Sequence, residues 1–372
     1  MKKTIILLLT IAAGLALIQA CSKSGSGPAN TTSAFDRKGL LTNVGNNIIV
    51  PAYTAFQASA SALDDAVIAF NATPNAATLT TAQNALVAAY KQWQSTSEYD
   101  FGPAAQISFR ANINTYPTNI TQIASNISAN TYNPDLLANL QAKGLPAIDY
   151  LLFGTGADNN AILVQYTTDA QAANRKTYLA ALAAEVKTLS TNVLNAWNGT
   201  YKATYLVADG TDVGSSLGQI VNQLVYDYEI LKNYEIGVPA GVQSLGTAFP
   251  EKVQAYYSKI SLQLTLLHLQ AMEDLYKGKS AQGDGLGLDD YLVKVNAKYS
   301  DGSSLNTAII NQFETAKTKL QALTDPLSAN IQSNPAAVTA AYTELQKLTV
   351  LLKTDMTSSL GILITFGDND GD

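Results

Sequence analysis

Apolar residues recur at every third or fourth position along four long stretches of the chain. This spacing places them on one face of a helix, which packs against other helices. No stretch alternates apolar and polar residues with a period of two, so we expect few strands. The four stripes are Tyr178, Leu182, Val186, Leu189, Val193 and Trp197; Val253, Tyr257, Ile260, Leu264, Leu267, Ala271 and Leu275; Leu305, Ile309, Phe313, Ala316, Leu320, Leu323 and Leu327; and Val338, Tyr342, Leu345, Leu348, Leu352 and Leu360.

Proline and glycine mark the ends of these helices. Pro250 is expected to open the second stripe and Gly278 to close it. Pro51 and Pro326 fall inside helical patterns, where each should begin a new helix or kink an existing one, because proline lacks the backbone donor. Asn334 is placed to cap the helix of the fourth stripe.

Two glycine-rich segments, residues 210–218 and 278–287, predict loops. The first of them divides the helical pattern into residues 34–205 and 206–372. Long helices with short connections favour antiparallel up-and-down packing. We therefore predict an all-α fold of two consecutive antiparallel helical bundles of the four-helix type.

The start of the chain is typical of a bacterial lipoprotein. Lys2 and Lys3 precede an apolar stretch, residues 5–18, which leads to Cys21. We predict a signal peptide at residues 1–20, a lipid on Cys21 and a tether over residues 21–33. An uncleaved anchor helix is the alternative, but the apolar run is short of the roughly 20 residues that span a bilayer.

Charge and cysteine usage narrow the functions. The chain has 23 basic and 29 acidic residues, and removing residues 1–20 takes away Lys2 and Lys3 and no acid, which leaves 21 against 29, or −8. No basic patch is present, so nucleic acid is not an expected partner. Cys21 is the only cysteine, and no acidic run follows it. We expect an outer-membrane lipoprotein of the cell envelope that faces the periplasm and contains no disulfide.

The segment Gly144–Gly154, with the sequence Gly-Leu-Pro-Ala-Ile-Asp-Tyr-Leu-Leu-Phe-Gly, is the most informative motif. Its local interpretation is a turn that leads into a helix, with Pro146 at the first helical position. Asp149 would then lie in the first turn, where a carboxylate is stabilised by the helix dipole.

The same segment resembles the signature of the imelysin family of bacterial envelope proteins, Gly-x-His-x-x-Glu followed by Tyr-Leu-Leu-Phe-Gly. Here Pro146 stands at the His position and Asp149 at the Glu position. Further segments resemble the family in the same order: residues 47–56, Trp93 with residues 101–104, Arg110 with Tyr116-Pro117-Thr118, residues 175–197, Glu229 before residues 236–239, and Tyr257-Ser258.

The resemblance implies an all-helical fold of two bundles. The family is linked to metallopeptidase activity, to iron-regulated uptake and to periplasmic binding of polysaccharide or metal, and these links leave the function open. We expect a ligand site where the bundles meet, built from Gly144, Asp149, Tyr150, Arg110, Tyr116, Glu229, Tyr257 and Ser258.

A metal ion is the first candidate ligand for this site, and a divalent metal or iron fits the resemblance. Asp149 and Glu229 are the candidate metal ligands that the resemblance implies. Asp149 stands at the Glu position of the motif, and Glu229 falls where the family has an acidic residue. We hypothesise that Glu229 faces Asp149 and Arg110 across the junction. Asp227 and Glu235 are acidic neighbours of Glu229 in the sequence.

Peptidase chemistry has little support in the residues. His268 is the only histidine, whereas zinc peptidases generally bind their metal through two or more such ligands. We assign no catalytic residue, and Cys21 is expected to carry the lipid and so is not a nucleophile. His268 is interpreted as a half-buried helix residue with one hydrogen bond. A residual metallopeptidase using Asp149, Glu229 and His268 is the alternative.

Two further features admit functional and structural interpretations. Nineteen tyrosines are suited to lining a groove for a glycan or peptide, and they also fit the core of a large bundle. The tail at residues 367–372 has alternating acids like the start of a calcium loop, or is a frayed end. The preferred function is a lipid-anchored periplasmic binding protein for a metal ion, glycan or peptide, and a scaffold without a small ligand is a third possibility.

Overall fold

The computed structural model describes residues 34–367. The predicted signal peptide, Cys21 and the tether lie outside these residues, as does the calcium-like tail beyond Gly367. From Asp36 on, the chain forms one compact unit. The division into domains at residues 205 and 206 stays a prediction.

The described residues are mainly helical with almost no strand, which confirms the predicted all-α class. The α-helices are α2 (Arg37–Asn43), α3 (Val50–Ala72), α4 (Ala76–Gln94), α5 (Pro103–Gln106), α6 (Phe109–Asn114), α7 (Ile120–Ala129), α8 (Gly144–Asp149), α9 (Asn159–Thr167), α10 (Ala172–Ala196), α11 (Lys202–Val207), α12 (Ser216–Ile230), α13 (Ser261–Tyr276), α14 (Leu288–Lys294), α15 (Leu305–Gln321), α16 (Leu327–Ser333), α17 (Pro335–Val350) and α18 (Thr357–Leu360).

Shorter helical segments and one hairpin connect these helices. Turns of π-helix occupy Val44–Ile49, Tyr150–Gly154, Trp197–Tyr201, Leu231–Gly237 and Leu351–Met356, and turns of 3₁₀-helix occupy Ser97–Tyr99, Leu137–Ala142 and Pro250–Lys252. The two named strands of residues 34–367, β1 (Lys279–Ser280) and β2 (Gly283–Asp284), pair antiparallel inside the predicted loop 278–287.

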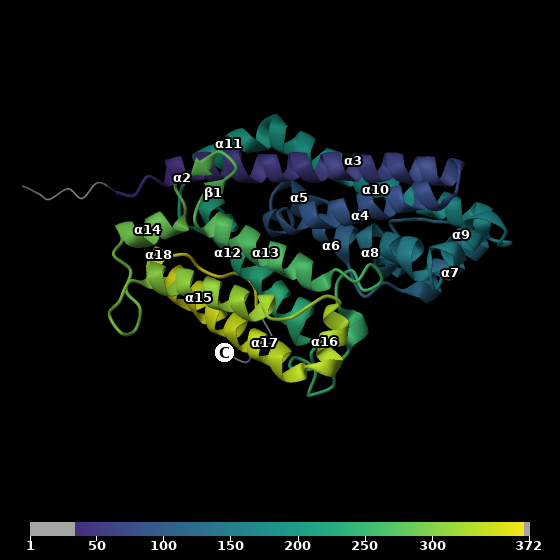
Figure 1. The fold of residues 1–372 in the computed structure, drawn as a ribbon. Coiled ribbons are helices and arrows are strands. Elements are labelled where there is room, and N and C mark those ends of the chain that lie inside the picture. The colour runs from purple at the N-terminus through teal and green to yellow at the C-terminus, as the bar shows by residue number, and fades with distance from the viewer. Residues whose placement is uncertain (1–33, 368–372) are drawn as a thin grey trace, which may run out of the picture. The chain divides into compact units, whose positions relative to one another are not determined.

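The first half of the chain is built on α3, α4 and α10, which pack along one another (Figure 1). Its core is aromatic: the rings of Phe56, Trp93 and Phe109 have centroids 5.2 to 5.9 Å apart. Phe109 belongs to the short helix α6, so this packing also fixes the helix that carries Arg110.

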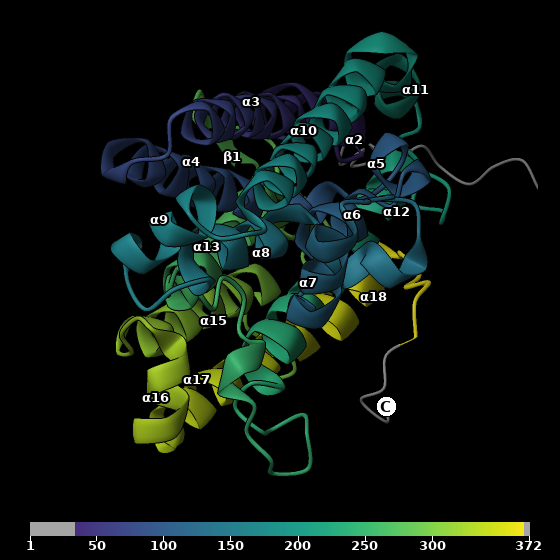
Figure 2. The same ribbon diagram turned by 90° about the vertical axis from the view of Figure 1, so that its right-hand side faces the viewer.

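The second half contains α12, α13, α15 and α17, with α15 packed along α17 and α13 packed against α15. Figures 1 and 2 show these helices in a layer beside the first set. The two layers meet where α4 contacts α13 and where α12 contacts the turn Ser97–Tyr99.

Three of the four predicted helices are confirmed. The stripes at 178–197 and 338–360 lie on α10 and on α17 with its continuation, and the stripe that starts at Leu305 lies on α15. Pro326 precedes a new helix, α16, as predicted, whereas α15 already ends at Gln321. Asn334 occupies the N-cap position of α17, but its side chain makes no capping hydrogen bond. None of the helices within residues 34–367 is long and apolar enough to cross a membrane.

The predicted helix from Val253 to Leu275 is wrong in its first two turns, because α13 starts only at Ser261. Ala255 and Lys259 have positive φ angles of 50° and 63°, which a helix does not accommodate. The start of α13 is set from a distance: the carboxylate of Asp325 accepts hydrogen bonds from the backbone N–H groups of Leu262 and Gln263. Apolar spacing alone could not reveal this capping residue.

Candidate functional site

Helix α8 and the π-helical turn Tyr150–Gly154 carry the Gly144–Gly154 motif, and α8 is buried along its whole length. Gly144 has a φ of +68°, and a Cβ atom there would lie 2.3 Å from the carbonyl oxygen of Ile113. Glycine is therefore required for α8 to approach α6 this closely. Gly144 therefore supports the site through the backbone.

Asp149 is the last residue of α8 and is 1% exposed. Its Oδ2 accepts a hydrogen bond from the backbone N–H of Tyr257 at 3.0 Å, and its Oδ1 accepts one from Ser258 at 3.1 Å. Burial raises the pKa of Asp149 to about 7, against these hydrogen bonds, which lower it. The prediction that Asp149 lies in the first helical turn is wrong, because the helix begins at Gly144 and the carboxylate binds a distant segment instead.

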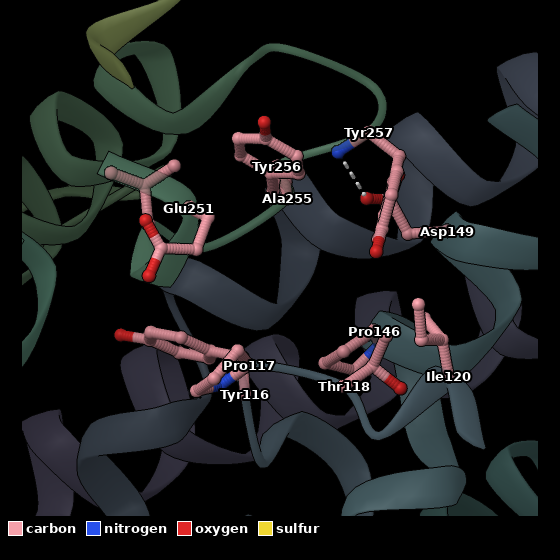
Figure 3. Close-up of a pocket in the computed structure, with 11 residues that line it drawn as sticks. Tyr116, Pro117, Thr118, Ile120, Pro146, Asp149, Glu251, Ala255, Tyr256 and Tyr257 are labelled. Carbon is pink, nitrogen blue, oxygen red and sulfur yellow. Dashed lines mark hydrogen bonds between the residues drawn. The ribbon is translucent and has the colours of Figure 1, made fainter. Parts of the chain in front are cut away.

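The carboxylate of Asp149 lies on a small cavity of about 130 Å³, which we call the motif pocket. Figure 3 shows Glu251 across this pocket from Asp149, with Pro146 on the same wall as Thr118. Tyr150 points elsewhere and packs edge-on against the ring of Tyr257, with centroids 5.1 Å apart. The motif pocket is lined by Tyr116, Pro117, Thr118, Ile120, Pro146, Asp149, Glu251, Val253, Ala255, Tyr256 and Tyr257.

A second and larger cavity, of about 690 Å³, lies on the other side of Tyr116. We call it the junction groove, because α6 forms one wall and α12 with the following π-helix forms the other. Tyr226 and Tyr234 on the second wall are 40% and 56% exposed. The groove is lined by Asp100, Arg110, Ala111, Asn114, Thr115, Tyr116, Pro117, Gln141, Tyr226, Ile230, Tyr234, Val238 and Lys252.

Behind the junction groove lies a buried group of charged side chains, Arg110, Asp227, Glu235 and His268, which we call the ion cluster. Nη2 of Arg110 lies 3.1 Å from Oδ1 of Asp227, and Oδ2 of Asp227 lies 2.8 Å from Nε2 of His268. Nδ1 of His268 lies 2.7 Å from Oε1 of Glu235. Ser97 completes the cluster by donating its hydroxyl to Asp227 at 3.0 Å.

The ion cluster fixes the charge of its histidine. Burial opposes the protonated form, but Asp227 and Glu235 raise the pKa of His268 to about 10. For Asp227, burial raises the pKa, while Arg110 and His268 lower it by more, so the carboxylate stays ionised. An imidazolium that donates from both nitrogens has no lone pair for a metal or a substrate proton.

His268 therefore differs from both of its sequence interpretations. It is 2% exposed rather than half-buried, and it contacts two carboxylates and a hydroxyl rather than making one hydrogen bond. Both of its ring nitrogens lie against carboxylates, an arrangement that does not suit a metal ligand or general base. The sequence could not show this, because Asp227 and Glu235 lie 41 and 33 residues away from it.

The hypothesis that Glu229 faces Arg110 and Asp149 is wrong. Successive residues of a helix point about 100° apart, so Glu229 points away from Asp227, two positions earlier, which holds Arg110. Oε2 of Glu229 lies 2.9 Å from Nζ of Lys232 and accepts a hydrogen bond from Asn233 at 3.0 Å. The metal pair Asp149 and Glu229 is not assembled.

Other predicted residues do come together. Tyr116, Asp149 and Tyr257 line the motif pocket, where Ser258 contributes its backbone N–H, and Arg110 and Tyr116 line the junction groove. Within residues 34–367, no group of three or more His, Cys, Asp or Glu side chains is arranged to hold a metal ion. Sequence analysis missed Glu251, Tyr234 and Lys252, for which no motif gave a signal.

A two-layer all-α fold with the Gly144–Gly154 helix at the meeting of its layers defines an imelysin-like protein. The chain belongs to the imelysin family, since the family's model, Imelysin (Peptidase_M75), matches residues 49–354. It is 23% identical over 342 residues to iron-regulated protein A of Synechococcus elongatus, covering 86% of this chain and 88% of that protein.

Solved structures share the fold. A protein from Parabacteroides distasonis, described as an iron-regulated protein A precursor, superposes with a TM-score of 0.72 at 16% identity, covering 90% of this chain and 97% of that one. An imelysin-like protein from Psychrobacter arcticum superposes with a TM-score of 0.67 at 18% identity, covering 90% and 100%. At these identities the likeness establishes the fold alone.

Proposed function

We propose that this chain is a lipid-anchored binding protein of the cell envelope and that its ligand, an oligosaccharide, lies in the junction groove. The basic start, the apolar stretch 5–18 and Cys21 support secretion and attachment to the outer membrane on its periplasmic side. Membership of the imelysin family supports an envelope location.

The groove's dimensions and lining carry the proposal. Its volume of about 690 Å³ lies within the roughly 300–1,000 Å³ of small-ligand sites. The exposed rings of Tyr226 and Tyr234 offer flat apolar faces, while Asn114 and Gln141 offer amide donors and acceptors. A sugar ring presents both an apolar face and hydroxyl groups, so it matches this combination.

A metal ion fits the described residues poorly. Both oxygens of Asp149 accept backbone hydrogen bonds, and Glu229 is paired with Lys232. The two carboxylates would have to give up these partners and approach each other before they could share a metal. We therefore favour an organic molecule over a metal ion as the ligand.

Residual peptidase activity is disfavoured by the same contacts. The proposed alternative needs Asp149, Glu229 and His268 in one site, but His268 is held by Asp227 and Glu235 in its protonated form. None of the three is free to bind a metal or to activate a water molecule.

Binding measurements on the purified protein distinguish these functions. Native mass spectrometry with a mixture of short neutral and uronic-acid oligosaccharides should reveal a saturable adduct. Calorimetric titration of chelator-treated protein with ferrous, ferric, zinc and calcium ions tests the metal candidate, and digestion of unfolded casein tests the peptidase. If a short peptide binds and no sugar does, the peptide replaces the oligosaccharide as the proposed ligand. The same holds for a metal ion that binds tightly and with a fixed stoichiometry.

A further inference from the structure

The residues that follow α18 lie along α12 and are held there by one side chain. Asn222 donates from Nδ2 to the carbonyl oxygen of Leu363 at 2.9 Å, and its Oδ1 accepts from the backbone N–H of Thr365 at 2.8 Å. The hydroxyl of Thr365 also donates to this oxygen, at 3.0 Å. We call residues 362–366 the C-terminal strap.

The C-terminal strap ends against the wall of the junction groove. The ring of Phe366 packs edge-on against the ring of Tyr226, with centroids 5.1 Å apart. Asn222 and Tyr226 are four residues apart on α12 and so lie on the same side of the helix. One helix face therefore holds both the backbone and the terminal ring of the strap.

Tyr226 in turn covers Arg110. Cζ of Arg110 lies 5.2 Å from the centroid of the Tyr226 ring, within the range of a cation–π contact. Nη2 of Arg110 is used by Asp227 and by the carbonyl oxygen of Ser97. Its Nε and Nη1 are buried and have no hydrogen-bond partner among the described residues, although Nε lies 3.9 Å from Oδ2 of Asp100.

We propose that the C-terminal strap is a positioning element of the junction groove, and that Phe366 holds the Tyr226 ring over Arg110. Arginine has five N–H donors, and leaving some of them buried and unmatched is unfavourable. When the ring swings away, these donors become available to an acceptor group in the groove. The strap thus determines whether the Tyr226 ring covers Arg110 or leaves the N–H donors of Arg110 open to the groove. The inference rests on the groove's geometry and does not depend on the ligand.

Chemical modification of arginine by phenylglyoxal tests this inference without a ligand. The chain has three arginines, and Arg175 is a matched internal control for Arg110. Their side chains are 12% and 13% exposed, each pairs with an aspartate, and each lies over a tyrosine ring. Arg175 belongs to α10 and has no contact with the strap.

The modification rate of each arginine is measured by peptide mass spectrometry. In Phe366→Ala, we expect the Arg110 rate to rise about tenfold while the Arg175 rate stays unchanged. Tyr226→Ala should give the same selective rise, Phe366→Tyr should keep the original rate, and Leu363→Ala, whose side chain is 68% exposed, should change nothing. An unchanged Arg110 rate in Phe366→Ala or Tyr226→Ala overturns the inference, as does an equal rise at Arg110 and Arg175, which would mean general loosening.

Discussion

Arg110 of α6 and Asp227 of α12 form a buried ion pair, with Nη2 3.1 Å from Oδ1, that joins the two halves of the chain. Their side chains are 13% and 1% exposed, so water screens the pair little. Because Arg110 also lines the junction groove, the contact that joins the layers is part of the wall of the proposed ligand site.

Replacing Asp227 should destabilise the protein strongly. Asp227→Ala removes the carboxylate that Arg110 and His268 share and leaves each with one carboxylate, Asp100 or Glu235. Breaking a buried pair costs about 3–5 kcal/mol in free energy of unfolding. Urea unfolding measures this cost. The matched control is Glu344→Gln, which removes a pair with Lys347, whose side chain is 57% exposed, and should cost less than about 1 kcal/mol. Equal effects of the two substitutions would contradict the importance of the ion cluster.

The protons of Asp149, Glu98 and His268 should make stability fall as the pH rises from about 5 to about 10. Burial raises the pKa of Glu98 to about 8 and that of Asp149 to about 7, and Asp227 and Glu235 raise that of His268 to about 10. Each group binds its proton more tightly when folded than when unfolded, so the free energy of unfolding decreases with pH until the folded pKa is passed. The slope is at most about 1.4 kcal/mol per pH unit for each proton.

The substitution Glu98→Gln separates one of these protons from the others. Glutamine imitates the neutral acid, so the variant should lose the contribution of Glu98 to the slope between about pH 5 and pH 8 and retain the contributions of Asp149 and His268. Thermal unfolding of parent and variant over pH 5–9 provides the comparison. Parallel curves for the two proteins would show that Glu98 titrates normally.

Gly144→Ala should disrupt the approach of α8 to α6. The substitution introduces a strained φ of +68° and a Cβ atom 2.3 Å from the carbonyl oxygen of Ile113. Gly246 is the control, since its φ is +84° but nothing lies within 4 Å of its Cβ position. Backbone strain costs roughly 1–3 kcal/mol at either site, so Gly144→Ala should cost clearly more than Gly246→Ala in chemical unfolding. Equal costs would mean that the contact with Ile113 relaxes freely.

Asp149 should hold the segment before α13 in place. Asp149→Ala removes the acceptor for the N–H groups of Tyr257 and Ser258, which should then exchange with deuterium at least tenfold faster. Asp325→Ala is the reciprocal control, because Asp325 binds Leu262 and Gln263 in the same way. Each variant should affect its own pair of amides, as resolved by fragmentation mass spectrometry, and faster exchange at both pairs in either variant would argue against separate anchors.

The sequence was informative where local pattern determines structure. The apolar stripes predicted α10, α15 and α17 because each of these helices buries one face. The start of α13 was mispredicted because it depends on Asp325, which is distant in the sequence. Spacing could place Asp227 and Glu229 on different faces but could not tell which face meets Arg110.

The family resemblance identified residues that meet in the folded chain but not their chemistry. Tyr116, Asp149, Tyr257 and Ser258 do meet at the motif pocket, whereas Glu229 lies elsewhere. The histidine of the motif is replaced by Pro146, and the single His268 is taken up by a structural ion cluster. The chemistry of the site therefore depends on pairings that only the folded chain reveals.

The most direct test of the proposed function locates the bound oligosaccharide by comparing two tyrosine variants. Tyr234, on the groove wall, and Tyr299, outside both cavities, are 56% and 36% exposed. Native mass spectrometry of the protein with short oligosaccharides should show an adduct that survives Tyr299→Ala and is lost in Tyr234→Ala. No adduct with the parent protein, or equal adducts with both variants, would contradict an oligosaccharide site in the junction groove.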